Sequence, residues 1–197
     1  ITGCSRGIGK TVAHELARLG YTVLGAVRSQ SSYGQLEAEG KAMMIGGGGT
    51  ILPIHLDVSS DDQISSAVSR VEAILKERNL ELIGIVNNAG INPEADIYST
   101  IWKDGKGTVP DNELADMSVA KRVMDTNVLG VFRVTKAFLP LLAKQSKVGR
   151  ILLLGSYFGS VSGAMELSHL YYEASTCAME VFASGLRRSL PNQEIGS

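Results

Sequence analysis

Short apolar runs alternate with longer amphipathic stretches along this 197-residue chain. Runs at 22–27, 51–56, 82–86 and 151–154 are typical of buried strands, because they are brief and bounded by polar or turn-forming residues. Strands that alternate with helices indicate βαβ units, which build a parallel sheet with helices on both faces. No repeat or shift in composition marks a second domain. We therefore predict one doubly wound α/β domain with three layers, α/β/α, over residues 1–197.

Apolar residues at helical spacing predict the helices between these strands. One helix is expected to begin at the opening glycines and end near Gly20, and another to follow the hydroxyl and acidic caps at 59–62. A long helix is expected around 131–141, and a last one from about 170 to 190. These helices are long enough to cover a parallel sheet.

Three further segments carry distinct predictions. Pro53 cannot donate a ladder hydrogen bond, which places the second strand at a sheet edge. Residues 34–49 contain four consecutive glycines, which are costly to order, so this segment is expected to be a surface loop. Residues 91–117 show no periodicity and are expected to form a long irregular excursion beside a substrate pocket.

The residues at the strand ends point to a site. In open parallel sheets, ligands bind beyond the carboxyl ends of the strands. The chain opens at what is expected to be the end of a further strand. This strand and the four predicted above each lead to a residue able to turn tightly, carry charge or form hydrogen bonds, and these residues are Gly3, Arg28, Asp57, Asn87 and Ser156.

Composition narrows the classes of partner. A net charge of −1 and a pI near 6.4 provide no broad basic field, which disfavours nucleic acid and anionic membranes. No apolar run approaches the roughly 20 residues of a membrane span, so small molecules are the expected partners. Cys4 and Cys177 lack metal-ligand spacing and favour a reducing compartment, giving an expectation of a cytoplasmic protein. The three histidines form no cluster, and no metal site is predicted.

The opening stretch ITGCSRGIGKT fits two kinds of nucleotide site. Its ending, Gly9-Lys10-Thr11, is typical of a P-loop, but five residues rather than four separate Gly3 from Gly9. A P-loop NTPase remains an alternative in which Asp57 serves the magnesium ion. Glycines at 3, 7 and 9 favour instead a dinucleotide-binding turn that leads into a helix.

The residue that follows the next strand bears on the coenzyme. Arg28 lies nineteen residues after Gly9, about where this kind of site contacts the adenosine ribose. Its planar guanidinium suits a 2′-phosphate, and Arg6 in the glycine turn could contact the same group. The expected coenzyme is therefore NADP, with NAD less favoured. Two solvated arginines at loop ends are the simpler alternative.

Five ordered motifs resemble those of the short-chain dehydrogenase/reductase family. The resemblance implies a Rossmann-like sheet with NAD(P) across its carboxyl edge, and it is compatible with a homodimer or homotetramer. Compared with the family, the chain is expected to be incomplete at both ends, lacking most of a first strand and the last strands. The motifs are T-G-x3-G-I-G at 2–9, L-D-V at 56–58, N-N-A-G at 87–90, N-V-x-G at 127–130 and G-R-I-L-L-L-G-S at 149–156.

The resemblance also implies the coenzyme-binding residues. Asp57 and Val58 would hold the adenine, although Asp57 could instead only cap the following helix. Asn88, Ala89 and Gly90 would line the adenine ribose and support the central strand, although Asn88 could simply satisfy backbone groups of a turn. The pyrophosphate and adenosine would be surrounded by the glycine turn and helix N-terminus, with Gly3, Ser5, Arg6, Gly7, Ile8 and Gly9.

The family's catalytic group is only partly present. Ser156 would orient a substrate carbonyl, Tyr172 would pass a proton, and Asn127 would join a water relay. The tyrosine motif Y-x-A-S-K reads Tyr172-Glu173-Ala174-Ser175-Thr176 here, so an uncharged threonine takes the place of the lysine. In a helix, Thr176 shares a face with Tyr172, where a cation would have favoured the ionised phenol. Asn127 could instead be a mid-helix asparagine that satisfies a neighbouring backbone, and Tyr172 could instead be an amphipathic packing residue.

These residues lead to two hypotheses. The first is an NADP(H)-dependent oxidoreductase that interconverts an alcohol and a carbonyl on a small organic substrate, with Tyr172 as acid/base and Thr176 against the coenzyme. The second is a catalytically silent NADP-binding protein that serves regulation or interaction, because the lysine is missing at Thr176.

Overall fold

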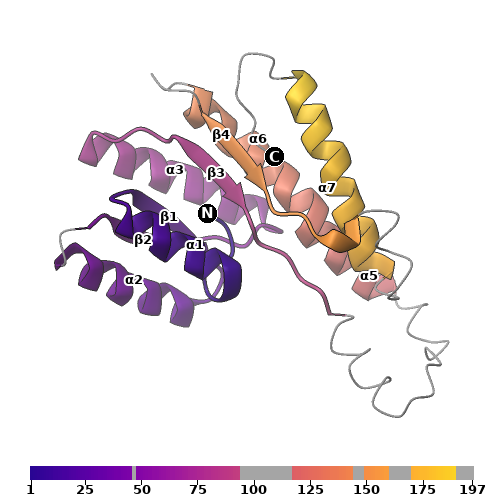
Figure 1. The fold of residues 1–197 in the computed structure, drawn as a ribbon, viewed down its shortest axis with the longest axis horizontal. Coiled ribbons are helices and arrows are strands. Elements are labelled where there is room, and N and C mark those ends of the chain that lie inside the picture. Colours follow the sequence, from indigo (N-terminus) through magenta and orange to yellow (C-terminus); the bar gives the residue numbers. More distant parts are fainter. Residues whose placement is uncertain (46–47, 94–116, 144–148, 160–169, 190–197) are drawn as a thin grey trace, which may run out of the picture.

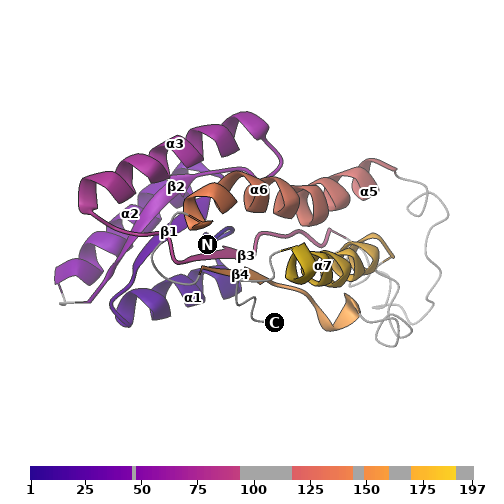
Figure 2. The ribbon, with the colours of Figure 1, turned by 90° about the horizontal axis from the view of Figure 1, so that it is seen from above.

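The computed structural model describes residues 1–45, 48–93, 117–143, 149–159 and 170–189. Helices cover both faces of a set of parallel strands, as the sequence predicts (Figures 1 and 2). Figure 2 shows α3 (Asp61–Arg78) and α6 (Gly130–Ala143) on one side of the strands, with α1 (Gly7–Arg18) and α7 (Leu170–Ser189) on the other. The predicted three-layer α/β/α class is confirmed.

Four strands and the opening residues form the sheet layer. β1 (Thr22–Val27) pairs in parallel with β2 (Thr50–His55), and β3 (Gly84–Asn87) pairs in parallel with β4 (Arg150–Leu153). Residues 1–4 lie between the two pairs and join them through backbone hydrogen bonds. The spatial order is therefore β2, β1, residues 1–4, β3, β4.

The joining bonds are short and regular. Ala26 N–H donates to the Ile1 carbonyl at 2.8 Å, and Cys4 N–H donates to the Ala26 carbonyl at 3.0 Å. On the other side, Thr2 N–H donates to the Val86 carbonyl at 2.9 Å. Neighbouring parallel strands run in the same direction, so their carboxyl ends lie at one edge of the sheet. This pairing therefore brings the residues at the strand ends together.

Pro53 lies opposite Gly25 in the β1 and β2 ladder. Within the described ranges β2 pairs with β1 alone, which agrees with the prediction of an edge strand.

Separate apolar clusters bury the two faces of the sheet. The cluster beneath α3 and α6 includes Ile54, Val71, Val134 and Phe138, each at most 8% exposed. The cluster on the opposite face includes Ala13, Val27, Leu36 and Ile51, each at most 3% exposed. The small side chain of Ala13 lets α1 approach the strands closely. The apolar faces of α3 and α6 pack against the sheet, whereas α1 packs through its small residues Ala13 and Ala17 and leaves Leu19 74% exposed.

The segment 34–49 is not the surface loop that its glycines predict. It belongs mostly to α2 (Gln30–Ile45), a helix capped by Ser29, whose hydroxyl accepts from the Ser32 N–H at 3.2 Å. Leu36 is 3% exposed and fixes α2 against β1 and β2. Gly40 permits this contact, because a Cβ there would collide with the Ile51 carbonyl. Tertiary packing has overridden weak local propensity.

The predicted helix around 131–141 is part of a longer, interrupted one. α5 (Met117–Met124) leads into a π-helical turn at Asp125–Leu129, called the π turn below, and α6 follows directly. By length and composition this stretch of 27 residues could cross a membrane, although half of its apolar window is buried here. A core helix passes the same test, so this is weak evidence of a span. Most of the excursion predicted at 91–117 falls in 94–116, outside the described residues.

The close approach of α2 to β2 yields a stability prediction. Gly40→Ala is expected to lower the free energy of unfolding by about 1–3 kcal/mol, since the new methyl group overpacks against the Ile51 backbone. Gly34→Ala, in the same helix with open space around its Cα, is the matched control and is expected to stabilise by about 0.5–1 kcal/mol. Urea unfolding measures both. Equal effects of the two substitutions would contradict this packing account.

Candidate functional site

A cavity of about 420 Å³ opens at the carboxyl ends of the strands. This volume lies within the roughly 300–1,000 Å³ of typical small-molecule sites. The residues that the sequence singles out are brought together there, with one exception, Ser156. The lining includes Gly3, Ser5, Arg6, Gly7, Ile8, Gly9, Arg28, Asp57, Val58, Asn88, Ala89, Gly90, Asn127, Tyr172 and Thr176.

The glycine turn forms one wall of the cavity and opens into α1. Gly3 and Gly7 have φ of 74° and 58°, in the left-handed region that favours glycine. Arg6 occupies the cap position of α1 and makes no side-chain cap hydrogen bond. The first N–H groups of α1 and its dipole therefore make the turn a suitable anion site.

The two residues that would define a P-loop are engaged elsewhere. The Lys10 ammonium pairs with the Glu39 carboxylate of α2 at 2.7 Å, and the Thr11 hydroxyl donates to the Gly7 carbonyl at 3.2 Å. Neither residue lines the cavity. This arrangement ties α1 to α2 and gives no support to a phosphate and magnesium site of the P-loop kind.

Asn88 holds the glycine turn in place. Its carboxamide donates to the carbonyls of Thr2 at 2.8 Å and Gly3 at 3.2 Å. The Thr2 hydroxyl accepts from the N–H groups of Asn88 and Ala89, both at 3.0 Å. The structural interpretation of Asn88 is therefore supported, while its place in the cavity wall keeps a binding role open. Sequence reasoning missed Thr2, although its position directly before Gly3 was a usable signal.

Asp57 also has two roles available. One carboxylate oxygen, Oδ1, accepts from the Ser59 N–H at 2.9 Å and the Ser59 hydroxyl at 2.6 Å, which closes the turn before α3. The expected helix cap is not Asp57 but Ser60, whose hydroxyl accepts from the Gln63 N–H at 3.3 Å. The other carboxylate oxygen of Asp57, Oδ2, lies 3.9 Å from the guanidinium of Arg28. Burial alone would raise the pKa of this carboxyl, but the Ser59 hydrogen bonds and the Arg28 charge together hold the pKa below its usual value. Asp57 is thus an anion beside the cavity at neutral pH.

Arg28 lies at the end of β1, with 73% of its side chain exposed. Its backbone carbonyl contacts His55 Nε2 at 2.7 Å, which fixes the main chain between β1 and α2. The side chain therefore extends from a fixed main chain, and its guanidinium lies at the rim of the cavity beside Asp57.

The π turn places Asn127 in the cavity wall. Asn127 is 6% exposed, and its carboxamide makes a two-way contact with Ile91, accepting from the N–H at 2.8 Å and donating to the carbonyl at 2.9 Å. Such π turns occur frequently at functional sites. The contact supports the alternative in which Asn127 satisfies a neighbouring backbone, and it also fixes the loop after β3 against the cavity.

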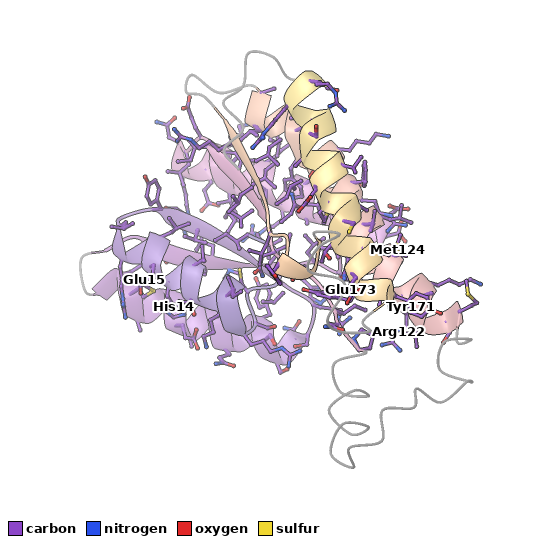
Figure 3. The ribbon with its side chains drawn as sticks, turned by 45° about the vertical axis from the view of Figure 1, so that its right-hand side comes forward. His14, Glu15, Arg122, Met124, Tyr171 and Glu173 are labelled. Atoms are coloured by element: carbon purple, nitrogen blue, oxygen red, sulfur yellow. The ribbon has the colours of Figure 1, made fainter. Side chains whose placement is uncertain are left out.

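Tyr172 and Thr176 line the cavity from the first turns of α7. Thr176 is 6% exposed, and its hydroxyl donates to the carbonyls of Glu173 at 2.9 Å and Tyr172 at 3.2 Å. Figure 3 shows Tyr171 and Glu173 near the labelled residues of α5, which packs against α7. The adjacent Tyr171 does not line the cavity.

Ser156 is the predicted residue that the cavity does not include. Leu154 and Gly155 of the same segment do line the cavity. The Ser156 carbonyl accepts from the Gly159 N–H at 2.9 Å, closing the short 3-10 turn Tyr157–Gly159. The chain from 160 to 169 lies outside the described residues. The proposed role of Ser156 stays a prediction.

Several lining residues were missed by sequence reasoning. Ile91 and Thr126 directly neighbour predicted residues, and Asn92 lies two positions after Gly90, which was the available signal, whereas Met179 gave none. Among the side chains that the structure describes, no three His, Cys, Asp or Glu residues gather as a metal site.

Comparison with known proteins assigns the chain to a protein family. The family model described as short chain dehydrogenase matches residues 1–196. The chain is 30% identical over 195 residues to a 3-oxoacyl-(acyl-carrier-protein) reductase of Pseudomonas aeruginosa, covering 99% of this chain and 68% of the relative. It is 32% identical over 196 residues to an NADPH-dependent pterin aldehyde reductase of Arabidopsis thaliana, with coverage of 99% and 68%. A 3beta-hydroxysteroid dehydrogenase of Caenorhabditis elegans is 34% identical over 187 residues, covering 95% of this chain and 43% of that protein.

Comparison with solved structures leads to the same family. A 3-ketoacyl-ACP reductase from Sinorhizobium meliloti superposes with a TM-score of 0.76 at 26% identity, covering 99% of this chain and 67% of that one. A blue fluorescent protein from a metagenomic library, solved in complex with NADPH, gives 0.77 at 26% identity, with coverage of 100% and 70%. With the ordered motifs and the Rossmann-like sheet, these matches show that the chain belongs to the short-chain dehydrogenase/reductase family of NAD(P)-dependent oxidoreductases.

Proposed function

We propose that the chain is an NADP(H)-dependent oxidoreductase that interconverts an alcohol and a carbonyl on a small organic substrate. One observation carries the proposal: a single cavity joins the glycine turn, the ends of β1, β2 and β3, the π turn and the start of α7. The two halves of the lining suit different tasks, since glycine N–H groups bind phosphate and a phenol transfers protons. The bound coenzyme would supply the hydride.

The binding half is built for a dinucleotide. The N–H groups at the start of α1 are directed toward the turn, where a pyrophosphate would be bound as an anion at a helix N-terminus. Gly9 lets α1 begin close against the turn, because a Cβ there would collide with the Asn88 carboxamide and the Gly3 carbonyl. Asp57 and Val58 lie at the wall expected to hold the adenine, and Ala89 and Gly90 border the central strand.

The rim near Arg28 supports NADP over NAD. Directly after Arg28, α2 begins at Gln30 with a cluster of serine hydroxyls, in which Ser29 Oγ lies 2.8 Å from Ser32 Oγ and 3.2 Å from Ser31 Oγ. Hydroxyls at a helix N-terminus beside a guanidinium suit a phosphate monoester. The negative charge of Asp57 would repel a 2′-phosphate only in part, because its Oδ1 already accepts hydrogen bonds from Ser59. Two relatives support it, one named NADPH-dependent and one solved with NADPH.

The catalytic half rests on Tyr172. Its phenol is the acid/base group that lines the cavity, Asn127 holds the adjoining loop, and Ser156 would orient the carbonyl from the segment beyond Gly155. General acid–base catalysis of this kind contributes about 10²–10⁴-fold in rate. The substrate would lie between Tyr172 and the nicotinamide.

A second candidate function is a silent NADP-binding protein. The bonding of Thr176 favours it, because its hydroxyl is directed at carbonyls of its own helix and provides no positive charge beside Tyr172. Such a protein would bind the coenzyme for regulation or interaction and would leave carbonyl substrates unchanged.

The coenzyme preference is tested at Arg28. Arg28→Ala is expected to raise the Kd for NADPH about tenfold and to change the Kd for NADH by less than about twofold, since a charge-assisted contact to the 2′-phosphate is lost. Arg18→Ala removes a similarly exposed arginine of α1 that pairs with Glu15, away from the cavity, and serves as the control. Titration calorimetry measures each Kd. Parallel weakening of both coenzymes would refute the 2′-phosphate assignment.

The proton-transfer role is tested by a pair of neighbouring tyrosines. Tyr172→Phe is expected to lower kcat for reduction of a panel of aldehydes and ketones about 10²–10⁴-fold, while the Kd for NADPH stays within about twofold. Tyr171→Phe changes the adjacent residue outside the cavity lining and is expected to leave kcat unchanged. If both substitutions leave kcat unchanged, Tyr172 is not the acid/base group.

The two candidate functions are separated at Thr176. If the site is catalytic without a cation, the unmodified chain reduces carbonyls, and Thr176→Lys is expected to raise kcat because an ammonium group favours the ionised phenol. Thr176→Gln is the control for side-chain length without charge. An inactive unmodified chain that gains activity only in Thr176→Lys would establish the silent protein.

A further inference from the structure

Ser175 lies between the two parts of the proposed catalytic site without lining the cavity. It is fully buried, with 0% of its surface exposed. Its hydroxyl donates to the Tyr172 carbonyl at 2.7 Å and accepts from the Asn127 carboxamide at 3.0 Å. A hydroxyl that both donates and accepts in a buried position fixes the distance between its two partners.

Both amide hydrogens of the Asn127 side chain are used in hydrogen bonds. Its two amide hydrogens are directed at the Ile91 carbonyl and at Ser175 Oγ, while its Oδ1 accepts from the Ile91 N–H. Exchanging the oxygen and nitrogen would set Oδ1 against the Ile91 carbonyl, so the orientation of the carboxamide is determined by the network. The bond to Ser175 completes that determination from the side of α7.

The resulting chain of hydrogen bonds crosses three segments that are distant in sequence. The loop after β3 is joined to the π turn over 36 residues, and the π turn is joined to α7 over 48 residues. Tyr172 and Asn127, which both line the cavity, are connected by hydrogen bonds through Ser175.

We infer that Ser175 is a positioning residue that sets Tyr172 against Asn127, an inference that rests on the proposed oxidoreductase function. Its hydroxyl does not contact the reacting atoms. It holds the first turn of α7 at the distance from the π turn that proton transfer requires. Because Thr176 supplies no cation to orient the phenol, the placement of Tyr172 depends on this buried contact.

Ser175→Ala is expected to lower kcat about tenfold to a hundredfold, with the Kd for NADPH within about twofold, since small displacements of a catalytic group cost this much. Ser175→Cys keeps the size and a weak donor and acceptor, and is expected to retain part of the lost rate. Ser184→Ala, an exposed serine of the same helix that contacts Arg188, is the control and should leave kcat unchanged.

A double-mutant cycle separates positioning from general destabilisation. If Ser175 acts through Asn127, Ser175→Ala causes little further loss of kcat in an Asn127→Ala background. Losses that multiply, or a Ser175→Ala protein with unchanged kcat, would overturn the inference.

A readout without turnover keeps this inference distinct from the proposed function. In ¹⁵N spectra, the Asn127 side-chain amide is expected to exchange slowly with solvent, and to shift and exchange faster in Ser175→Ala. Unchanged signals in that variant would reject the positioning role. A chain that binds NADPH yet reduces no carbonyl, but shows these spectral changes, would refute only the proposed catalysis.

Discussion

The contact between the Thr2 hydroxyl and the backbone of Asn88 and Ala89 is the constraint on which the site depends. It joins the opening residues to the end of β3 across 86 positions of sequence. In the opposite direction, the Asn88 carboxamide donates hydrogen bonds to the carbonyls of Thr2 and Gly3. The glycine turn is thereby fixed relative to the sheet from both directions. These bonds set the turn against the end of β3, while the packing of Ala13 and the Lys10–Glu39 pair hold the rest of α1 against the sheet and α2.

The fold was largely predictable because its signals are local and periodic. β1 has the predicted bounds, and the caps at 59–62 begin a helix at Asp61. The failure at α2 has a physical reason: four glycines suggested a loop, but Gly40 is what lets the helix meet the backbone of β2. A glycine that permits close packing cannot be distinguished by local composition from a glycine that permits flexibility.

The site was predictable in its membership and not in its hydrogen bonding. Residues at strand ends were expected to meet, since parallel strands share a carboxyl edge, and Arg28, Asp57 and Asn88 line one cavity. The partners of Asn127 could not be predicted, because Ile91 and Ser175 reach it only through tertiary folding and an extra residue in the π turn. Ser156 shows the converse, since a motif position alone does not place a side chain in a cavity.

Thr176 changes how the rest of the site must work. A lysine would orient and polarise the phenol by charge, which acts over several ångströms and tolerates small errors in position. Threonine leaves only hydrogen bonds and packing, which act at contact distance and tolerate little displacement. In such a site, Tyr172 would have to be positioned by the backbone of α7 and by the π turn. The two residues that join these elements are buried, Ser175 wholly and Asn127 nearly so. A catalytic site built on this buried network without a cation would therefore have to fix positions by hydrogen bonds rather than by charge.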